Sequence, residues 1–421
     1  MGKNFADIYA SSNDAIALEQ KFFLKEEVTR GLAAVPAATD FLYTLSGGTI
    51  NFQQPVESSP HRSGRHHTSV IKQKTTTEWS LPTFFNIDTL LGAASTAEID
   101  LAVRLLWKSL MGKEDITGGS PVFTAGTPPD VTFSMFENGD HWAVQAPGAF
   151  VESNNASFPG DGQAQSEWAG MAKTALTVGM GQSTIDNDGG ATVTVAAGEG
   201  ERFPTNAMVM IVEADGVTRS ADTPNGTPAY VGTVTGDVVQ LLDAPGGTPL
   251  VLADANGSVA LTPIYLTYYE PEEPHVAIND PQTGLQGSLT IVGLGATDCV
   301  RSAGINMVNN HELQDFCYGE EGLGGRLFTP GGRFTAEVTL ELNLNKELTG
   351  FLNKIKAFDG EDITIILGDA TGRHLQIEVP KAIFSIPEIS VPDTGTIPIS
   401  FTGNAYQTAL DAADEVTVSF L

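Results

Sequence analysis

Apolar and polar residues alternate most regularly between Phe334 and Leu344, where every even position is apolar and every odd position is polar or acidic. A period of two residues is typical of a β-strand with one face buried and the other in solvent. The segment Thr75–Leu81 has the same pattern in a less regular form. The alternation predicts a strand at each of these places, with a polar and partly acidic exposed face.

Two other segments have the apolar spacing of an α-helix. Residues Ala97–Leu110 and Leu348–Ile355 place apolar side chains three and four positions apart, which lines one face of a helix. These side chains are Ile99, Ala102, Val103, Leu106 and Leu110 in the first segment, and Leu348, Phe351, Leu352 and Ile355 in the second, at an offset of 249. We expect Ser95 or Thr96 to cap the first helix and Gly360 to end the second.

The second half of the chain repeats the first. Residues Gly139–Ala172 match Gly372–Ala405 at a constant offset of 233, without a gap. Most of the matched residues are glycine and proline, which determine backbone shape. The matches are Gly139 with Gly372, His141 with His374, Pro147 with Pro380, Ala149 with Ala382, Pro159 with Pro392, Gly162 with Gly395, Gly170 with Gly403 and Ala172 with Ala405. Such a match indicates one supersecondary unit used twice.

The repeat continues upstream at other offsets. Ile50-Asn51 matches Ile305-Asn306 at an offset of 255, and the segment from Thr76 to Leu81 matches that from Thr335 to Leu340 at an offset of 259. Because the offset falls from 249 at the helix to 233 at the strands that follow, the first copy has about sixteen extra residues. We assign them to Gly112–Asp130, which is rich in glycine and proline and is expected to be a loop.

These patterns divide the chain into four parts: an N-terminal arm at residues 1–20, a first module at 21–176, a β-rich spacer at 177–274 and a second module at 275–421. The spacer has five strand candidates and two Asn-Gly turn signals. The candidates are Thr192–Val195, Met208–Val212, Val231–Val234, Val238–Leu241 and Val259–Tyr269. We predict a mainly β fold: two β-sandwich modules with one helix each, and a spacer that forms a small Ig-like sandwich or barrel. The alternative is that the spacer is an enlarged loop of the first module.

Composition agrees with a folded, β-rich protein. The chain has 421 residues, of which 41% are hydrophobic and 45 are glycine, and this suits short strands joined by turns. No apolar stretch approaches the ~20 residues that a membrane-spanning helix needs, and residues 1–20 show no secretion signal. Cys299 and Cys317 are expected to be reduced, buried thiols, and the alternative is a disulfide or a metal-binding pair.

Charge is the second strong feature. The formal net charge is −29, with 51 acidic and 22 basic residues, and such a surface repels nucleic acid. Acidity that only keeps the protein soluble is an equal alternative. The segment His61–Lys74 is an exception, because it holds three histidines and four basic residues, which are Arg62, Arg65, Lys72 and Lys74. It is either a docking arm for an acidic neighbour or a solvated loop.

Catalytic and ligand-binding patterns are not found in the sequence. The pair His66-His67 has no further ligands at metal-site spacing, and Asp186–Gly189 lacks the later ligands of a calcium loop. No nucleophile and base occur in a known motif context. We therefore expect no enzyme activity, no cofactor and no metal, and a structural role for the matched His141 and His374.

The order of strands, long loop, strand, helix and strands resembles that of a bacteriophage tail tube protein, the major tail protein of long, non-contractile tails. The best matches are Glu98–Val151 and Glu347–Ile389, and the segments Ser58–Lys74 and Asn309–Pro330 lie where the family has its long inter-strand loop. The spacer is a departure from the family pattern. The resemblance implies β-sandwich modules, six to a ring, with rings stacked into a hollow tube.

Two modules per chain then imply trimeric, pseudo-hexameric rings, without enzyme activity, in a virion tail assembled in the host cytoplasm. The implied partners are further copies of the chain, the tape-measure, terminator and distal tail proteins, and double-stranded DNA that passes without specific binding; no membrane is involved. Arg62, Arg65, Lys72 and Lys74 would contact the next ring, and the spacer would project outward. The expected channel-lining residues are Thr76, Glu78, Glu337, Thr339 and Glu341.

Two other functions remain open from the sequence. One is another ring component of a virion or injection machine, such as a baseplate or tail-terminator protein. The other is a β-rich surface adhesin that carries an Ig-like spacer. A hydrolase without a recognisable motif ranks last.

Overall fold

The structure is a computed structural model that describes residues 16–53, 56–58, 62–63, 66–67, 70–72, 76–85, 100–117, 120–125, 131–140, 142–177, 183–186, 190–213, 228–250, 264–269, 287–291, 300–313, 328–329, 333–346, 348–368, 374–389, 391 and 393–421. These residues form β-strands, two α-helices and two short 3-10 helices. The predicted mainly β fold class is thus confirmed.

The first module contains α2 (Leu101–Met111) and fourteen described strands, and the second module contains α3 (Leu348–Ala357) and nine. The strands of the first module are β1 (Ile16–Glu26), β2 (Phe41–Leu42), β3 (Thr49–Gln53), β4 (Val56–Ser58), β5 (Arg62–Ser63), β6 (His66–His67), β7 (Val70–Lys72), β8 (Thr76–Phe84), β9 (Lys113–Thr117), β10 (Ser120–Thr124), β11 (Phe133–Asp140), β12 (Trp142–Pro159), β13 (Gln165–Ala172) and β14 (Leu176–Thr177). Those of the second are β21 (Gly287–Ile291), β22 (Val300–Val308), β23 (Glu312–Leu313), β24 (Phe328–Thr329), β25 (Thr335–Asn343), β26 (Glu361–Gly368), β27 (His374–Phe384), β28 (Pro398–Ala405) and β29 (Thr417–Phe420), with β23 and β24 forming a separate two-stranded ribbon. Because β1 begins at Ile16, residues 16–20 belong to the sheet and not to the expected arm.

Strand pairing is the same in the two modules. In the first, β1 pairs with β11, β11 with β12, β12 with β13 and with β14, β13 with β8, and β8 with β3. In the second, β21 pairs with β26, β26 with β27, β27 with β28 and with β29, β28 with β25, and β25 with β22. The helix follows the third of these strands in chain order each time, so one topology occurs twice.

The register of the strands reproduces the sequence offsets. Ile50 lies opposite Trp79, and Gly170 lies opposite Trp79 on the other side. At offsets of 255, 259 and 233, the corresponding residues are Ile305, Val338 and Gly403, and these too lie opposite one another. Matching register at three different offsets means that the loops changed length while the strand framework stayed the same.

The repeated glycines Gly170 and Gly403 are required by close packing. A Cβ atom on Gly170 would lie 2.0 Å from the carbonyl oxygen of Phe150, and one on Gly403 would lie 2.8 Å from that of Ile383. Phe150 and Ile383 correspond at the same offset of 233. Both glycines therefore let a neighbouring strand approach at an equivalent point of the fold.

The two modules join through their sheets. The second half of β12 extends beyond the first module and pairs with β22, so that Ala156 lies opposite Ile305. A second connection corrects the sequence prediction: Gly112–Asp130, expected as a loop, contains strands β9 and β10, and β10 pairs with β29 of the second module. The strands β3, β8, β13, β12, β22, β25 and β28 consequently form one continuous antiparallel sheet.

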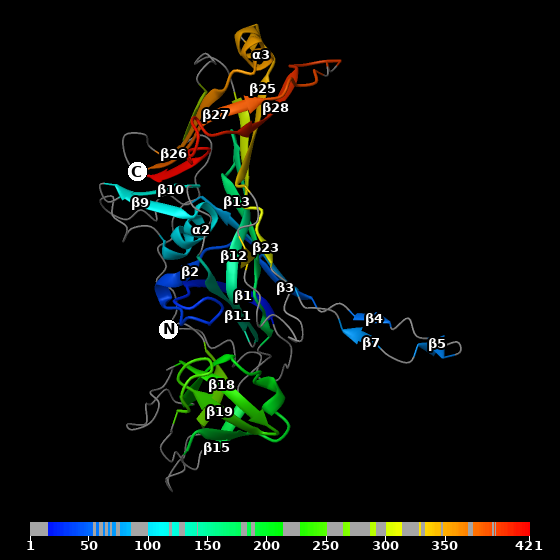
Figure 1. The fold of residues 1–421 in the computed structure, drawn as a ribbon, viewed down its shortest axis with the longest axis vertical. Coiled ribbons are helices and arrows are strands. Elements are labelled where there is room, and N and C mark those ends of the chain that lie inside the picture. The colour runs from blue at the N-terminus through cyan, green and yellow to red at the C-terminus, as the bar shows by residue number, and fades with distance from the viewer. Residues whose placement is uncertain are drawn as a thin grey trace.

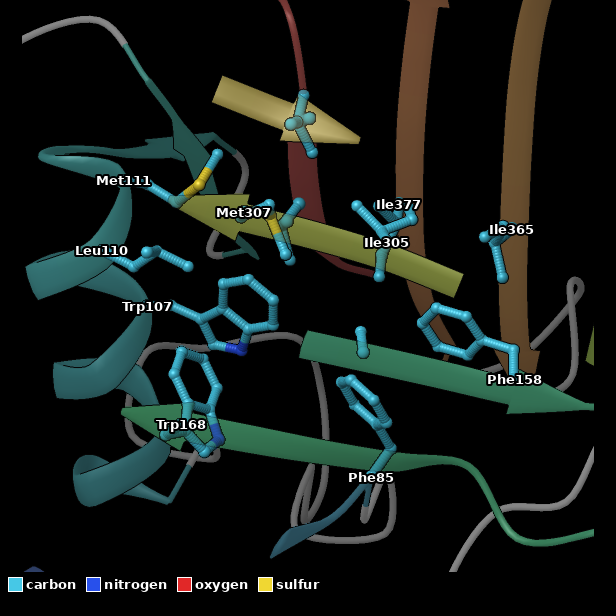
Figure 2. Close-up of a cluster of buried hydrophobic side chains, with 14 of the residues drawn as sticks. Phe85, Trp107, Leu110, Met111, Phe158, Trp168, Ile305, Met307, Ile365 and Ile377 are labelled. Atoms are coloured by element: carbon cyan, nitrogen blue, oxygen red, sulfur yellow. The ribbon is translucent and has the colours of Figure 1, made fainter. Parts of the chain in front are cut away.

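The helices cover the apolar face of this sheet, and both modules share one core. Figure 2 shows side chains of α2, including Trp107, beside strand residues of the second module such as Met307. Trp107 packs edge-to-face on Trp168 of β13, with ring centroids 4.9 Å apart. In the second module, Phe351 of α3 packs on Phe401 of β28 with centroids 5.1 Å apart.

The helix boundaries correct two predictions. The N-cap of α2 is Asp100, whose carboxylate accepts a hydrogen bond from the Ala102 N–H at 3.0 Å, and not Ser95 or Thr96. Asp100 takes this role because it directly precedes the first helical turn. The helix α3 ends at Ala357, and the following Phe358, at φ +56°, reverses the chain before the expected Gly360 is reached.

The spacer forms a closed barrel of six strands, which is one of the predicted forms and differs from an enlarged loop. Its strands, in barrel order, are β15 (Ser183–Asp186), β16 (Thr192–Val195), β19 (Val238–Leu242), β18 (Pro228–Thr235), β17 (Met208–Glu213) and β20 (Ile264–Tyr268). In Figure 1 the barrel lies at the end of the molecule opposite α3, beyond β1 and β11.

The barrel is attached to the first module by polar and apolar contacts. The buried Gln145 amide donates to the Met208 carbonyl at 3.0 Å and accepts from the Met208 N–H at 2.8 Å. The Tyr230 hydroxyl donates to the Ala33 carbonyl at 3.1 Å. Phe23 and Phe136 of the first module pack with Met208 and Tyr230. The spacer is therefore a separate barrel that is docked on the sheet.

Candidate functional site

The outer face of the continuous sheet is a regular polar surface that runs across seven described strands. Burial alternates along β25, where Ala336, Val338 and Leu340 are buried and the residues between them are exposed. The same alternation holds along β13 and along the second half of β12. Because the apolar residues face the helices, the polar face lies on the side away from α2 and α3.

This face is acidic and rich in small polar side chains. Its carboxylates are Glu78, Glu167, Glu337 and Glu341, and its hydroxyl and amide residues include Thr49, Asn51, Ser80, Ser153, Asn155, Ser157, Gln165, Ser302, Asn306, Thr335, Thr339, Ser400, Thr402 and Asn404. In the described strands of the continuous sheet, Arg301 is the one basic residue. The face therefore has a net negative charge.

Two of the carboxylates lie beside uncharged neighbours, most of which are amides. Glu337 lies between Asn306 on β22 and Asn404 on β28, and Glu78 lies between Asn51 and Met171. The asparagine amides keep the surface hydrated, and none of these neighbours neutralises the carboxylates.

Two carboxylates at this face, Glu341 and Glu167, accept side-chain hydrogen bonds. Glu341 accepts a hydrogen bond from the Ser302 hydroxyl at 3.2 Å and forms an ion pair with Arg301 at 3.5 Å. Glu167 accepts a weak bond from the Ser80 hydroxyl at 3.4 Å. One ion pair among four carboxylates leaves most of the negative charge of the face uncompensated.

The structure brings most of the expected channel-lining residues together. Glu78, Glu337 and Thr339 are exposed on the polar face, and Glu341 is half-buried on it. Thr76 lies in β8 opposite Gln53, and its side chain is outside the described atoms. Sequence reasoning missed Glu167, because β13 carries Ala169 and Met171 at the next polar positions and does not show a clear alternation.

The basic segment forms part of a hairpin arm. Beyond the sheet, the hairpin of β3 and β8 continues as two short ribbons, in which β4 (Val56–Ser58) pairs with β7 (Val70–Lys72) and β5 (Arg62–Ser63) pairs with β6 (His66–His67). Figure 1 shows these strands projecting away from the rest of the molecule. Arg62 and Lys72 lie in this arm, whereas Arg65 and Lys74 lie outside the described residues.

Two buried carboxyl groups have shifted acidities. Burial raises the pKa of Asp100 to about 7, although its hydrogen bonds from the backbone of α2 oppose the shift. Burial also raises the pKa of Glu137 to about 7, against a hydrogen bond donated by the Gln20 amide. Asp100 caps the helix α2 and Glu137 lies within the strand β11. We therefore assign both carboxyl groups to the fold and not to a functional site.

In the described ranges of the chain, no group of three or more His, Cys, Asp and Glu side chains is arranged to hold a metal ion. Neither α-helix of the described residues has the length and apolar character of a membrane-spanning segment. Cys299 and Cys317 lie outside the described residues.

The sequence matches no protein-family model, and a comparison with curated proteins gives no significant match.

Proposed function

We propose that this protein is the structural subunit of a bacteriophage tail tube. In this proposal three chains form a pseudo-hexameric ring, rings stack into a tube, and the acidic face of the continuous sheet lines a channel for DNA. The protein has no enzymatic role. The single observation that supports this most is that one chain holds two modules of equal topology in one continuous sheet with a polar, acidic face.

A channel for DNA needs walls that bind it weakly. Duplex DNA carries one negative charge per about 1.7 Å of its axis, and basic residues that neutralise these charges produce tight binding. A wall with Glu78, Glu167 and Glu337 and with hydroxyl and amide neighbours repels phosphate and stays hydrated. The composition of the polar face thus suits passage of DNA and does not suit its retention.

The proposal also assigns positions in the tube to the hairpin arm and to the barrel. The arm extends the β3–β8 hairpin beyond the sheet and carries Arg62 and Lys72, so in the proposal it contacts an acidic surface of the next ring. The barrel is docked through Gln145 and Tyr230, away from the polar face. It would then decorate the outside of the tube.

Electron microscopy of the purified full chain and of the native particle tests the proposal. The expected result is tubes or trimeric rings with a central hole, and many copies of the chain per particle along the tail. A compact monomer at every concentration and salt condition would argue against a tube subunit. A low copy number confined to one end of the particle would favour a baseplate or terminator component.

A further inference from the structure

Each of the two segments that pair at the internal junction between the modules has an equivalent segment in the other module, and these two equivalents are not paired with each other. At the junction, residues 153–159 of β12 pair with β22. At the offset of 233, residues 153–159 correspond to 386–392, which follow β27, and at the offset of 255, β22 corresponds to β3. Within the described residues, β3 is paired on one side only, with β8, and residues 386–389 are in no strand.

We propose that the segment after β27 of one chain pairs with β3 of a second copy of the chain, in the register of the internal junction. Ala156 lies opposite Ile305 within the chain, so Ile389 of one copy would lie opposite Ile50 of the next. By the same offsets, Glu388 would lie opposite Asn51, and Pro387 opposite Phe52. The inference rests on the proposed function in that it names the contact that would close each ring.

Exposed apolar side chains support this occupant. At the internal junction, the core-facing residues Ala156, Ile305 and Met307 are fully buried and Phe158 is nearly so. Their counterparts at the free edges are Ile389, Ile50, Phe52 and Val391, of which Ile389, Phe52 and Val391 are 46%, 41% and 69% exposed. If two copies pair in the register of the internal junction, Ile389 and Val391 of one copy and Ile50 and Phe52 of the other are buried together at the contact.

The two free edges lie at opposite ends of the sheet. β3 is the first strand in the order β3–β8–β13–β12–β22–β25–β28. The segment after β27 lies at the other end of this order, because β27 pairs with β28, the last strand. One chain therefore cannot pair its own edges, and two different surfaces meet at each contact. Contacts of this heterologous kind produce a ring when the rotation closes, and closure removes the exposed sheet edges.

The polar face agrees with the same register. Asn155 and Asn306 lie opposite each other and are exposed, and their counterparts are Glu388 and Asn51. Pairing would place Glu388 of one copy beside Asn51 and, one strand further, Glu78 of the next. The acidic face would then continue across the contact between chains.

Pro387 makes the contact between chains weaker than the internal junction. The Asn309 N–H donates to Glu152 and the Gly160 N–H donates to Arg301 across the junction, so by alternation Asn154, the counterpart of Pro387, points its backbone at β22. Proline has no N–H to donate, so the ladder between chains has one hydrogen bond fewer. A proline at an edge also discourages pairing with unrelated strands.

A disulfide between chains tests the register directly. In the full chain with Cys299 and Cys317 changed to serine, N51C and E388C would be combined in one chain, or placed in separate chains that are mixed. Under oxidising conditions, the chain with both cysteines is expected to form a ladder of crosslinked oligomers. The mixture of the two single-cysteine chains is expected to form crosslinked dimers only. As a register control, Q53C with E388C is displaced by two residues and should crosslink at least tenfold more slowly.

Substitution of exposed residues tests the surface. Phe52→Asp or Ile389→Asp should abolish oligomers without unfolding the chain, since both side chains are already exposed. The control Phe358→Asp changes an exposed apolar residue at the end of α3 and should assemble normally. Rings without the N51C–E388C crosslink would overturn this inference and leave the proposed function, whereas crosslinked rings that never occur in phage tails would support the inference and refute the function. A wild-type chain that stays monomeric throughout would overturn the inference.

Discussion

Three glycine-to-alanine changes should have different and even opposite effects on stability. A Cβ atom on Gly170 would lie 2.0 Å from the Phe150 carbonyl oxygen and 2.6 Å from the Trp79 ring. On Gly403 the nearest contacts would be 2.7 Å, to the Phe384 ring, and 2.8 Å, to a carbonyl oxygen. On Gly350, within α3, nothing would lie within 4 Å. The predicted order of stability therefore depends on the sheet geometry and not on residue type.

The magnitudes follow from these distances. Forcing extra atoms into a packed core costs about 1–3 kcal/mol, and the loss of unfolded-state freedom on Gly→Ala returns roughly 0.4–1 kcal/mol. Because the neighbour of Gly170 is backbone, which cannot rotate away, we expect Gly170→Ala to cost about 3 kcal/mol. Gly403→Ala should cost less, about 2 kcal/mol, because the Phe384 ring can shift and the Ile383 carbonyl oxygen lies at 2.8 Å and not at 2.0 Å. Gly350→Ala should stabilise α3 by roughly 1 kcal/mol.

Native-state hydrogen exchange is the suitable assay, because a chain with two modules and a barrel does not have a single unfolding free energy. Gly170→Ala should speed exchange in β13 and β8, and Gly403→Ala should speed exchange more weakly in β28 and β25. Gly350→Ala should slow exchange in α3. Unchanged protection of β13 in Gly170→Ala would refute the close approach at Phe150, and with it the equivalence of the two glycines.

Three further outcomes are expected. Burial raises the pKa of Glu137 from 4.5 to about 7, so the folded chain binds this proton first, and thermal stability should rise as the pH falls from about 7 to about 4.5. Glu137→Gln should reduce this rise in thermal stability, and the exposed control Glu337→Gln should leave it unchanged. Identical pH profiles of thermal stability for the wild type and Glu137→Gln would contradict the prediction. Arg62→Glu with Arg65→Glu should block tube assembly while circular dichroism stays unchanged, and normal tubes would exclude an inter-ring arm. Glu337→Lys with Glu341→Lys should permit assembly but slow DNA exit, and unaltered ejection would mean that the charge serves solubility.

The strand framework could be predicted because its constraints are local. The alternation of residues 334–344 appears as β25, with Ala336, Val338, Leu340 and Leu342 buried. The gapless repeat at offset 233 could be found because Gly170 and Gly403 occupy positions where any side chain would collide with backbone. Such residues mark the sequence directly, so the offsets predicted the register.

The contacts between distant strands could not be predicted. Period two states which face of β12 is buried but not which strand lies beside it, so the pairing with β22 had no signal in the pattern. The sequence predicts a loop where the hairpin of β9 and β10 lies because glycines and prolines in that segment resemble turn residues, although Phe123 is fully buried against the second module. Among candidate site residues, Glu167 was missed for the related reason that a polar face built from many strands is visible only after pairing.

The asymmetry of the two copies has a consequence for assembly. Fusion in one chain holds β12 near β22, so the internal junction forms at high effective concentration, and β10 with β29 strengthens it. The free edges at β3 and after β27 have no such help, and Pro387 removes one donor. In the proposed ring, strong internal junctions would alternate with weaker contacts between chains, and the barrel, present once per chain, would alternate with bare modules. The ring should then have threefold and not sixfold symmetry, and dilution should separate it between chains while each pair of modules stays intact.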